Sequence, residues 1–215
     1  MLKEVGKLGM TKNKKTSKEI IQRTEETLET SKFGMELMQK GSPENRFVGL
    51  RNFVVFGRAV TNVLQNLRGI ENDFDNWYEP YVIEMESDPL MKFFYNIRSK
   101  ILKEGSLQVA TRVHIRKWTP ETSHLIGPPP PRAKSFFMGD KYGGSGWIVE
   151  LPDGTEEKYY IELPREIGEA DIYFRNPPQD HLGNRLEDKS LIEMCKLYLK
   201  YLQKMVDDAK KKFVK

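Results

Sequence analysis

Four side chains near the end of one apolar helical pattern are the best candidates for chemistry: Arg98, Ser99, Lys103 and Glu104. Apolar residues recur there at three- and four-residue steps, which predicts a helix with one buried face. Because a guanidinium is costly to bury alone, Arg98 must be paired with a carboxylate, solvated or used in function. The stretch therefore predicts either a structural arginine or a functional one.

This helix is one of five that the sequence predicts. Ser87 is expected to be its N-cap and Gly105 to end it. The other helices are expected at about residues 16–39, 42–69, 73–85 and 191–213, where the third is short or kinked at Pro80. The turns between the first four helices are very short, which favours antiparallel neighbours in a bundle.

Between the fourth and last helices the apolar period changes from helical to two. Residues 107–115 alternate as in a half-buried strand, and residues 147–151 and 158–163 form a hairpin pattern around a Pro-Asp-Gly turn. Four consecutive prolines, at 128–131, indicate a stiff spacer or a small ligand for a proline-binding groove. Residues 165–184 are expected to be irregular.

These patterns predict an α+β fold: an antiparallel helical bundle with a β-rich insertion at about 107–183, before the C-terminal helix. We expect one domain over residues 16–215, preceded by a flexible tail at 1–15 that is rich in lysine. Phe53 and Leu202 are expected in its core. The strong second helix, with many apolar faces, is expected to be central.

The sequence around Arg98, Phe93-Phe-Tyr-Asn-Ile-Arg-Ser-Lys-Ile-Leu-Lys-Glu-Gly105, resembles the HEPN superfamily. In that superfamily an arginine, a polar residue and then a histidine end such a helix. Arg98 matches the arginine and Ser99 the polar position, while Lys103 or Glu104 stands where the histidine would fall. The resemblance implies a helical, dimeric fold and, in many members, metal-independent cleavage of RNA in toxin–antitoxin or other defence systems.

The missing histidine changes the expected chemistry. Imidazole can exchange a proton near neutral pH, whereas an ordinary lysine titrates near 10.4 and is a poor base at pH 7. Glu104 could act as a base or pair with Lys100 on the surface. The structural alternative for Arg98 is a bond to a helix end or to Asp73, Asp75 or Glu79, and for Lys103 it is stabilisation of the helix dipole.

Composition limits the other function classes. The net charge of +4 fits a solvated surface as well as nucleic-acid binding, and the single cysteine, Cys195, fits a reducing compartment. A metal site would depend on His114, His124 and His181, which lack ligand-pair spacing, so no metal or cofactor is expected. We expect no signal peptide, no membrane span and a cytoplasmic location.

The sequence is compatible with three functions. The first is a HEPN-like binding or regulatory module without standard ribonuclease chemistry, dimeric, with RNA or a protein as partner. The second is an active ribonuclease that uses Arg98 with a non-standard partner. The third is a peptide- or ligand-binding protein that works through the β insertion. Separately, Trp118, Trp147 and Tyr159 would stack bases if they shared a sheet face with Arg112 and Arg116, but a packed sheet face is the favoured interpretation of these aromatic residues.

Overall fold

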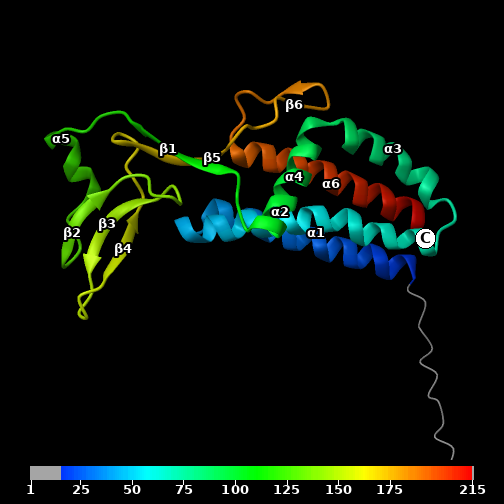
Figure 1. Ribbon diagram of the computed structural model, residues 1–215, viewed down its shortest axis with the longest axis horizontal. Coiled ribbons are helices and arrows are strands. Elements are labelled where there is room, and N and C mark those ends of the chain that lie inside the picture. Colours follow the sequence, from blue (N-terminus) through cyan, green and yellow to red (C-terminus); the bar gives the residue numbers. More distant parts are fainter. Residues whose placement is uncertain (1–15, 215) are drawn as a thin grey trace, which may run out of the picture.

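A computed structural model describes residues 16–214 and shows a mixed α+β fold, as predicted. The tail expected at residues 1–15 lies outside the described residues. Five long helices lie together at one end of an elongated molecule (Figure 1), and we call them the helical body. They are α1 (Ser17–Lys40), α2 (Pro43–Leu64), α3 (Phe74–Ser87), α4 (Pro89–Glu104) and α6 (Leu191–Phe213), with a 3₁₀ turn at Gln65–Gly69.

The first two helices pack unusually closely because glycines meet at their crossing. A Cβ atom added to Gly34 of α1 would lie 2.6 Å from the backbone nitrogen of Phe53 in α2, and one added to Gly49 would lie 2.5 Å from the Gly34 carbonyl oxygen. The buried Ser31 hydroxyl donates to the carbonyl of Phe53 at 2.9 Å. The small residues Ser31 and Gly34 of α1 and Gly49 of α2 therefore allow the backbones of the two helices to come into contact.

The core of the helical body centres on three aromatic rings from three helices. Phe53 of α2 contacts Phe94 of α4 and Tyr198 of α6 with ring centroids 5.8 and 6.0 Å apart, and Phe94 stacks on Tyr198 at 4.3 Å. Phe53 and Leu202 are fully buried, as predicted. Because α6 supplies Tyr198 and Leu202, the last helix packs with helices from the first half of the chain.

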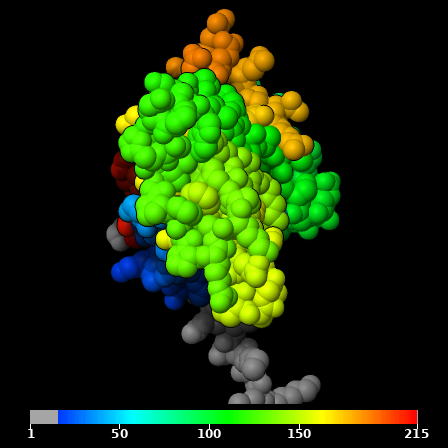
Figure 2. All heavy atoms as spheres, turned by 90° about the vertical axis from the view of Figure 1, so that its left-hand side faces the viewer, coloured from blue at the N-terminus to red at the C-terminus, as the bar shows by residue number. Residues whose placement is uncertain are grey.

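The β part extends away from the helical body as a two-stranded ribbon that leads to a small sheet (Figure 1). In the ribbon, β1 (Val109–Ile115) pairs antiparallel with β5 (Gly168–Phe174), from Val109↔Phe174 to Ile115↔Gly168. The far sheet, which we call the distal sheet, has the order β2 (Ala133–Phe137), β3 (Ser145–Glu150), β4 (Glu156–Ile161). In the end-on view the distal sheet and the green segment preceding it cover much of the helical body (Figure 2).

Smaller elements complete the chain. A short helix α5 (Pro120–Ser123) and a 3₁₀ turn (His124–Ile126) precede the distal sheet, and the pair β6 (Asp180–His181) and β7 (Asn184–Arg185) precedes α6. None of the helices within residues 16–214 is long and apolar enough to cross a membrane.

Several local predictions were confirmed and several were wrong. The capping box at Thr16, the left-handed cap at Gly105 and the β3–β4 hairpin are present. Ser87 is not the N-cap of α4: it is the last residue of α3, and the Asp88 carboxylate accepts from the Met91 amide at 2.8 Å. Residues 165–184 are not wholly irregular, since they contain β5 and β6. The helix expected at about 73–85 is present as α3 and contains Pro80.

Candidate functional site

The four side chains chosen from the sequence do not converge in the structure. Arg98 and Ser99 are half-buried on α4, while Lys103 and Glu104 are exposed in its last turn. The Ser99 hydroxyl donates to the carbonyl of Tyr95 in its own helix at 3.0 Å, which engages it locally. No hydrogen bond or ion pair joins Arg98, Lys103 or Glu104 to another side chain in residues 16–214.

The carboxylates considered as partners of Arg98 are also placed elsewhere. Asp73 pairs with Lys212 of α6, and Asp75 pairs with Arg68 at 2.6 Å. In the insertion, Trp147 and Tyr159 lie in the distal sheet, whereas Arg112 lies on β1 in the other sheet. These three residues therefore do not form the base-stacking face considered from the sequence.

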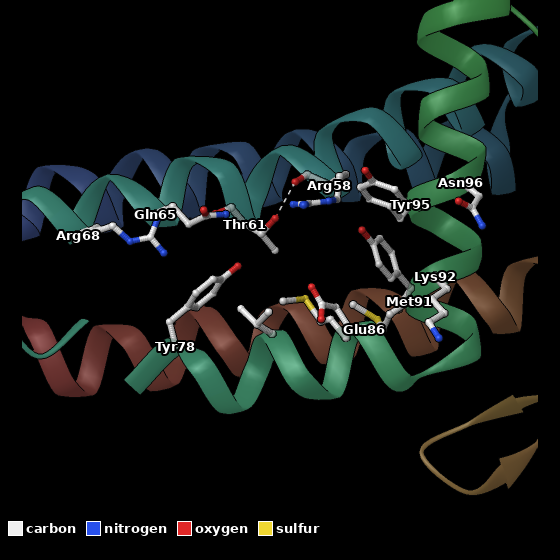
Figure 3. A pocket seen from close by; sticks show the side chains of 13 residues that line it. Arg58, Thr61, Gln65, Arg68, Tyr78, Glu86, Met91, Lys92, Tyr95 and Asn96 are labelled. Atoms are coloured by element: carbon white, nitrogen blue, oxygen red, sulfur yellow. Dashed lines mark hydrogen bonds between the residues drawn. The ribbon is translucent and has the colours of Figure 1, made fainter. Parts of the chain in front are cut away.

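A cavity lies instead between α2, α3 and α4 (Figure 3), and Tyr198 of α6 also lines it. Its volume is about 760 Å³. We call it the interhelical cleft. Its walls combine apolar, aromatic, amide and charged side chains: Arg58, Thr61, Gln65, Arg68, Tyr78, Val82, Met85, Glu86, Met91, Lys92, Tyr95, Asn96 and Tyr198.

Helical periodicity explains why these side chains face one space. On α2 and the turn after it, the cleft residues Arg58, Thr61, Gln65 and Arg68 follow one another at steps of three, four and three. Residues at these steps occupy the same side of a helix. A polar stripe on an otherwise apolar central helix was the signal that could have identified the cleft from sequence.

The floor of the cleft is buried and its rim is exposed. Thr61, Tyr78, Met91 and Tyr198 are each 5 % exposed or less. The Tyr198 hydroxyl makes no hydrogen bond with any residue in the described part of the chain, although its side chain is only 1 % exposed. The hydroxyl oxygen itself is not fully enclosed, so it can be reached from the cleft and can bind a molecule there.

Two tyrosines of the floor are influenced by the same arginine. Burial raises the pKa of Tyr78 and of Tyr198, and the positive charge of Arg58 acts in the opposite direction on both hydroxyls. Figure 3 shows the Tyr78 hydroxyl pointing across the cleft towards Thr61 and Gln65. Both tyrosines are therefore neutral hydrogen-bonding groups near pH 7, beside a permanent positive charge.

The cleft carries more positive than negative charge. Arg58, Arg68 and Lys92 face a single carboxylate, Glu86. Arg68 is already paired with Asp75, whereas Arg58 and Lys92 form no ion pair within residues 16–214. Arg58 is half-buried, donates to the Asn62 side chain at 3.1 Å and lies with its guanidinium carbon 5.5 Å from the centre of the Tyr95 ring.

The side chains that line the interhelical cleft are suited to binding a ligand. Its side chains include neither histidine nor cysteine, so the lining offers no group that exchanges a proton at its ordinary pKa near pH 7. Arginine, amides and tyrosine hydroxyls instead hold a ligand by hydrogen bonds, and methionine and aromatic side chains surround its apolar parts.

A second buried polar contact was missed because its partners are far apart in the chain. The Nδ1 atom of His181 lies 3.1 Å from both carboxylate oxygens of Asp88, and the Leu182 amide donates to Asp88 at 2.8 Å. His181 is thus buried, whereas His114 is exposed on β1. No group of three metal-ligating side chains occurs within residues 16–214.

A comparison with protein families corrects the resemblance stated above. The family model described as bacteriophage lambda protein ea47 matches residues 39–137, from the end of α1 through β2, which is less than half of the 215-residue chain. The matched family is not a HEPN family, so the HEPN assignment was wrong. No curated protein and no solved structure matches this chain.

Proposed function

We propose that this chain is a binding or regulatory module whose helical body, an antiparallel bundle, holds a small molecule in the interhelical cleft. The observation that carries the proposal is the cleft of about 760 Å³, with the buried side chains of Thr61, Tyr78, Met91 and Tyr198 at its floor. Pockets for drug-sized ligands have volumes of roughly 300–1,000 Å³ and a few polar groups among apolar ones. The lining of the cleft has this composition.

The other functions considered have less support. The insertion at residues 107–183 contains nine Lys and Arg residues against eleven Asp and Glu residues, so its charge does not favour RNA. The four candidate residues, Arg98, Ser99, Lys103 and Glu104, do not line the interhelical cleft. An RNA or protein partner, a dimer and a cytoplasmic location remain predictions from the sequence.

A neutral fluorescent probe tests the proposed function. N-phenyl-1-naphthylamine should bind the full chain saturably, with one site per chain. Met85→Trp should weaken this binding by about tenfold or more, because the larger side chain enters the cleft. Ile83→Trp is the matched control, since Ile83 lies on the same helix but is 62 % exposed and outside the cleft.

The comparison has clear outcomes. Circular dichroism should show that both variants keep the helical content of the parent chain. Saturable binding that is lost only in Met85→Trp supports the cleft as the site. Equal binding by a folded Met85→Trp variant, or no saturable binding by the parent chain, contradicts the proposal.

A further inference from the structure

The charge and shape of the interhelical cleft define its ligand more narrowly. We propose that it binds an organic anion with an aromatic body, whose anionic group lies at Arg58 and whose ring lies against the methionines and Tyr95. This inference rests on the proposed function, since it concerns the same site. Four observations support it: the unused donors of Arg58, the excess positive charge, the hydroxyls of Tyr78 and Tyr198 in the lining, and the apolar wall.

Arg58 is the strongest anion-binding group of the cleft. A guanidinium has five N–H donors, and one of them is used for the Asn62 side chain. The group lies near the Tyr95 ring, which fixes its plane, and no carboxylate neutralises it within residues 16–214. Because its side chain is half-buried, an anion placed here would be less screened than at an open surface.

Other polar groups of the cleft also favour an anion. The hydroxyls of Tyr78 and Tyr198 line the same cleft as Arg58 and can donate hydrogen bonds to a carboxylate, sulfonate or phosphate oxygen. Figure 3 shows Arg58 and Tyr78 on opposite sides of the space between α2 and α3. Lys92 adds a second cation at the exposed rim, while Glu86 is the single opposing charge.

The apolar side chains of the interhelical cleft favour a ligand with an aromatic ring. Val82, Met85 and Met91 line the α3 and α4 side of the cleft, next to the rings of Tyr95 and Tyr198. Thioether sulfur atoms contact aromatic rings favourably and adapt to their shape. Offset stacking on tyrosine adds to the area buried. An aromatic body is therefore a better fit than a polar sugar or a compact inorganic ion.

Two probes with the same rings separate charge from shape. 1-Anilinonaphthalene-8-sulfonate carries one sulfonate, and N-phenyl-1-naphthylamine is its neutral counterpart. Arg58→Gln should weaken binding of the sulfonate about tenfold, as expected for the loss of one charge-assisted hydrogen bond, and change binding of the neutral probe less than about twofold. Arg112→Gln is the matched control, because Arg112 also lies over a tyrosine ring, that of Tyr173, but on the β ribbon.

Two further variants protect the test against misfolding of Arg58→Gln. Arg58→Lys keeps the charge and should retain part of the preference for the sulfonate. Lys92 is exposed, so Lys92→Gln should fold normally and weaken the sulfonate by about twofold to threefold, with the effect removed by high salt.

The outcomes distinguish this inference from the function on which it rests. The neutral probe could bind in the cleft while binding of the sulfonate is insensitive to Arg58→Gln, Arg58→Lys and Lys92→Gln. That result would contradict the proposal of an anionic ligand but not the proposed function as a binding module. If neither probe binds saturably, both proposals fail. A selective loss of the sulfonate in the Arg58 variants, with Arg112→Gln unchanged, supports the anionic ligand.

Discussion

Asp88 is the residue on which two distant parts of the chain depend. Its carboxylate is 2 % exposed, caps α4 through the Met91 amide, and also binds the Leu182 amide and the ring of His181. One side chain therefore starts a helix and fastens the β6–β7 turn to the helical body. Hydrogen bonds to a buried carboxylate are stronger than those of an exposed cap.

We predict that Asp88→Ala lowers the free energy of unfolding by about 3 kcal/mol, because the cap and the two contacts with the turn are lost together. Ser190→Ala is the matched control: Ser190 caps α6 with the amide of Glu193 but is exposed, and its loss should cost about 1 kcal/mol. Urea unfolding measures both. Equal losses would mean that the contacts with His181 and Leu182 add nothing to the cap.

Contacts of this kind mark the limit of reasoning from sequence at the residue scale. Asp88 and His181 are 93 residues apart, and no local pattern connects them. The cleft shows the same limit, since no local pattern indicates that Tyr198 of α6 lines the same cavity as Arg58 of α2. A local pattern gives the face that a side chain occupies, while its partners depend on how helices cross.

The close crossing of α1 and α2 is the main feature at the scale of elements. Replacing glycine by alanine inside a helix normally favours the helix by about 1 kcal/mol. At Gly34 the added Cβ would stand 2.6 and 2.7 Å from backbone atoms of Phe53 and Gly49, which cannot move as a flexible side chain can. The steric cost should therefore exceed the gain in helix propensity.

We predict that Gly34→Ala destabilises the chain by roughly 1–3 kcal/mol, because α1 must separate from α2 and expose part of the core. Gly69→Ala serves as the control, since an added Cβ there meets nothing within 4 Å. Thermal or urea unfolding of both variants gives the comparison. A Gly34→Ala variant as stable as the parent chain would show that the two helices are not in backbone contact.

The elements themselves were largely readable from the sequence. The helices of the helical body and the β3–β4 hairpin follow local signals: caps, apolar period and a Pro-Asp-Gly turn. Strand β5 was missed because its partner β1 lies about 60 residues earlier, and Gly168 and Asp171 weaken its strand pattern. Non-local pairing, and not propensity, makes this segment a strand.

At the scale of the whole molecule, the error in family assignment has a physical origin. The resemblance depended on Arg98 and Ser99 within one helix, and a helix end of this kind occurs wherever an amphipathic helix leaves a core. The matched family model spans the end of α1, the next three helices and the first part of the insertion. Evidence spread over several packed elements constrains the fold more strongly than a two-residue match.

The distal sheet is joined to the rest of the molecule by the β1–β5 ribbon and by contacts with the first turns of α2, where Gly144 lies against Pro43. At the end of the ribbon the Arg116 amide donates to the carbonyl of Ile167 at 2.8 Å, so the two strands are close enough to be linked by a short turn. Tyr142, before β3, packs its ring at 5.1 Å from that of Phe47 in α2. The core residues of the helical body lie outside the distal sheet.

We therefore predict that replacing residues 117–166 by Asn-Gly leaves the helical body folded and the interhelical cleft functional. Helical circular dichroism should persist, binding of N-phenyl-1-naphthylamine should stay within about twofold, and the free energy of unfolding should fall by about 1–2 kcal/mol because the contacts of Tyr142 and Gly144 with α2 are lost. Tyr142→Ala in the full chain is the control and should cost less, since it removes only the contact with Phe47. If the shortened chain does not unfold cooperatively, the distal sheet is required for the helices to fold. If the shortened chain folds but no longer binds the probe, part of the binding site lies outside the helical body.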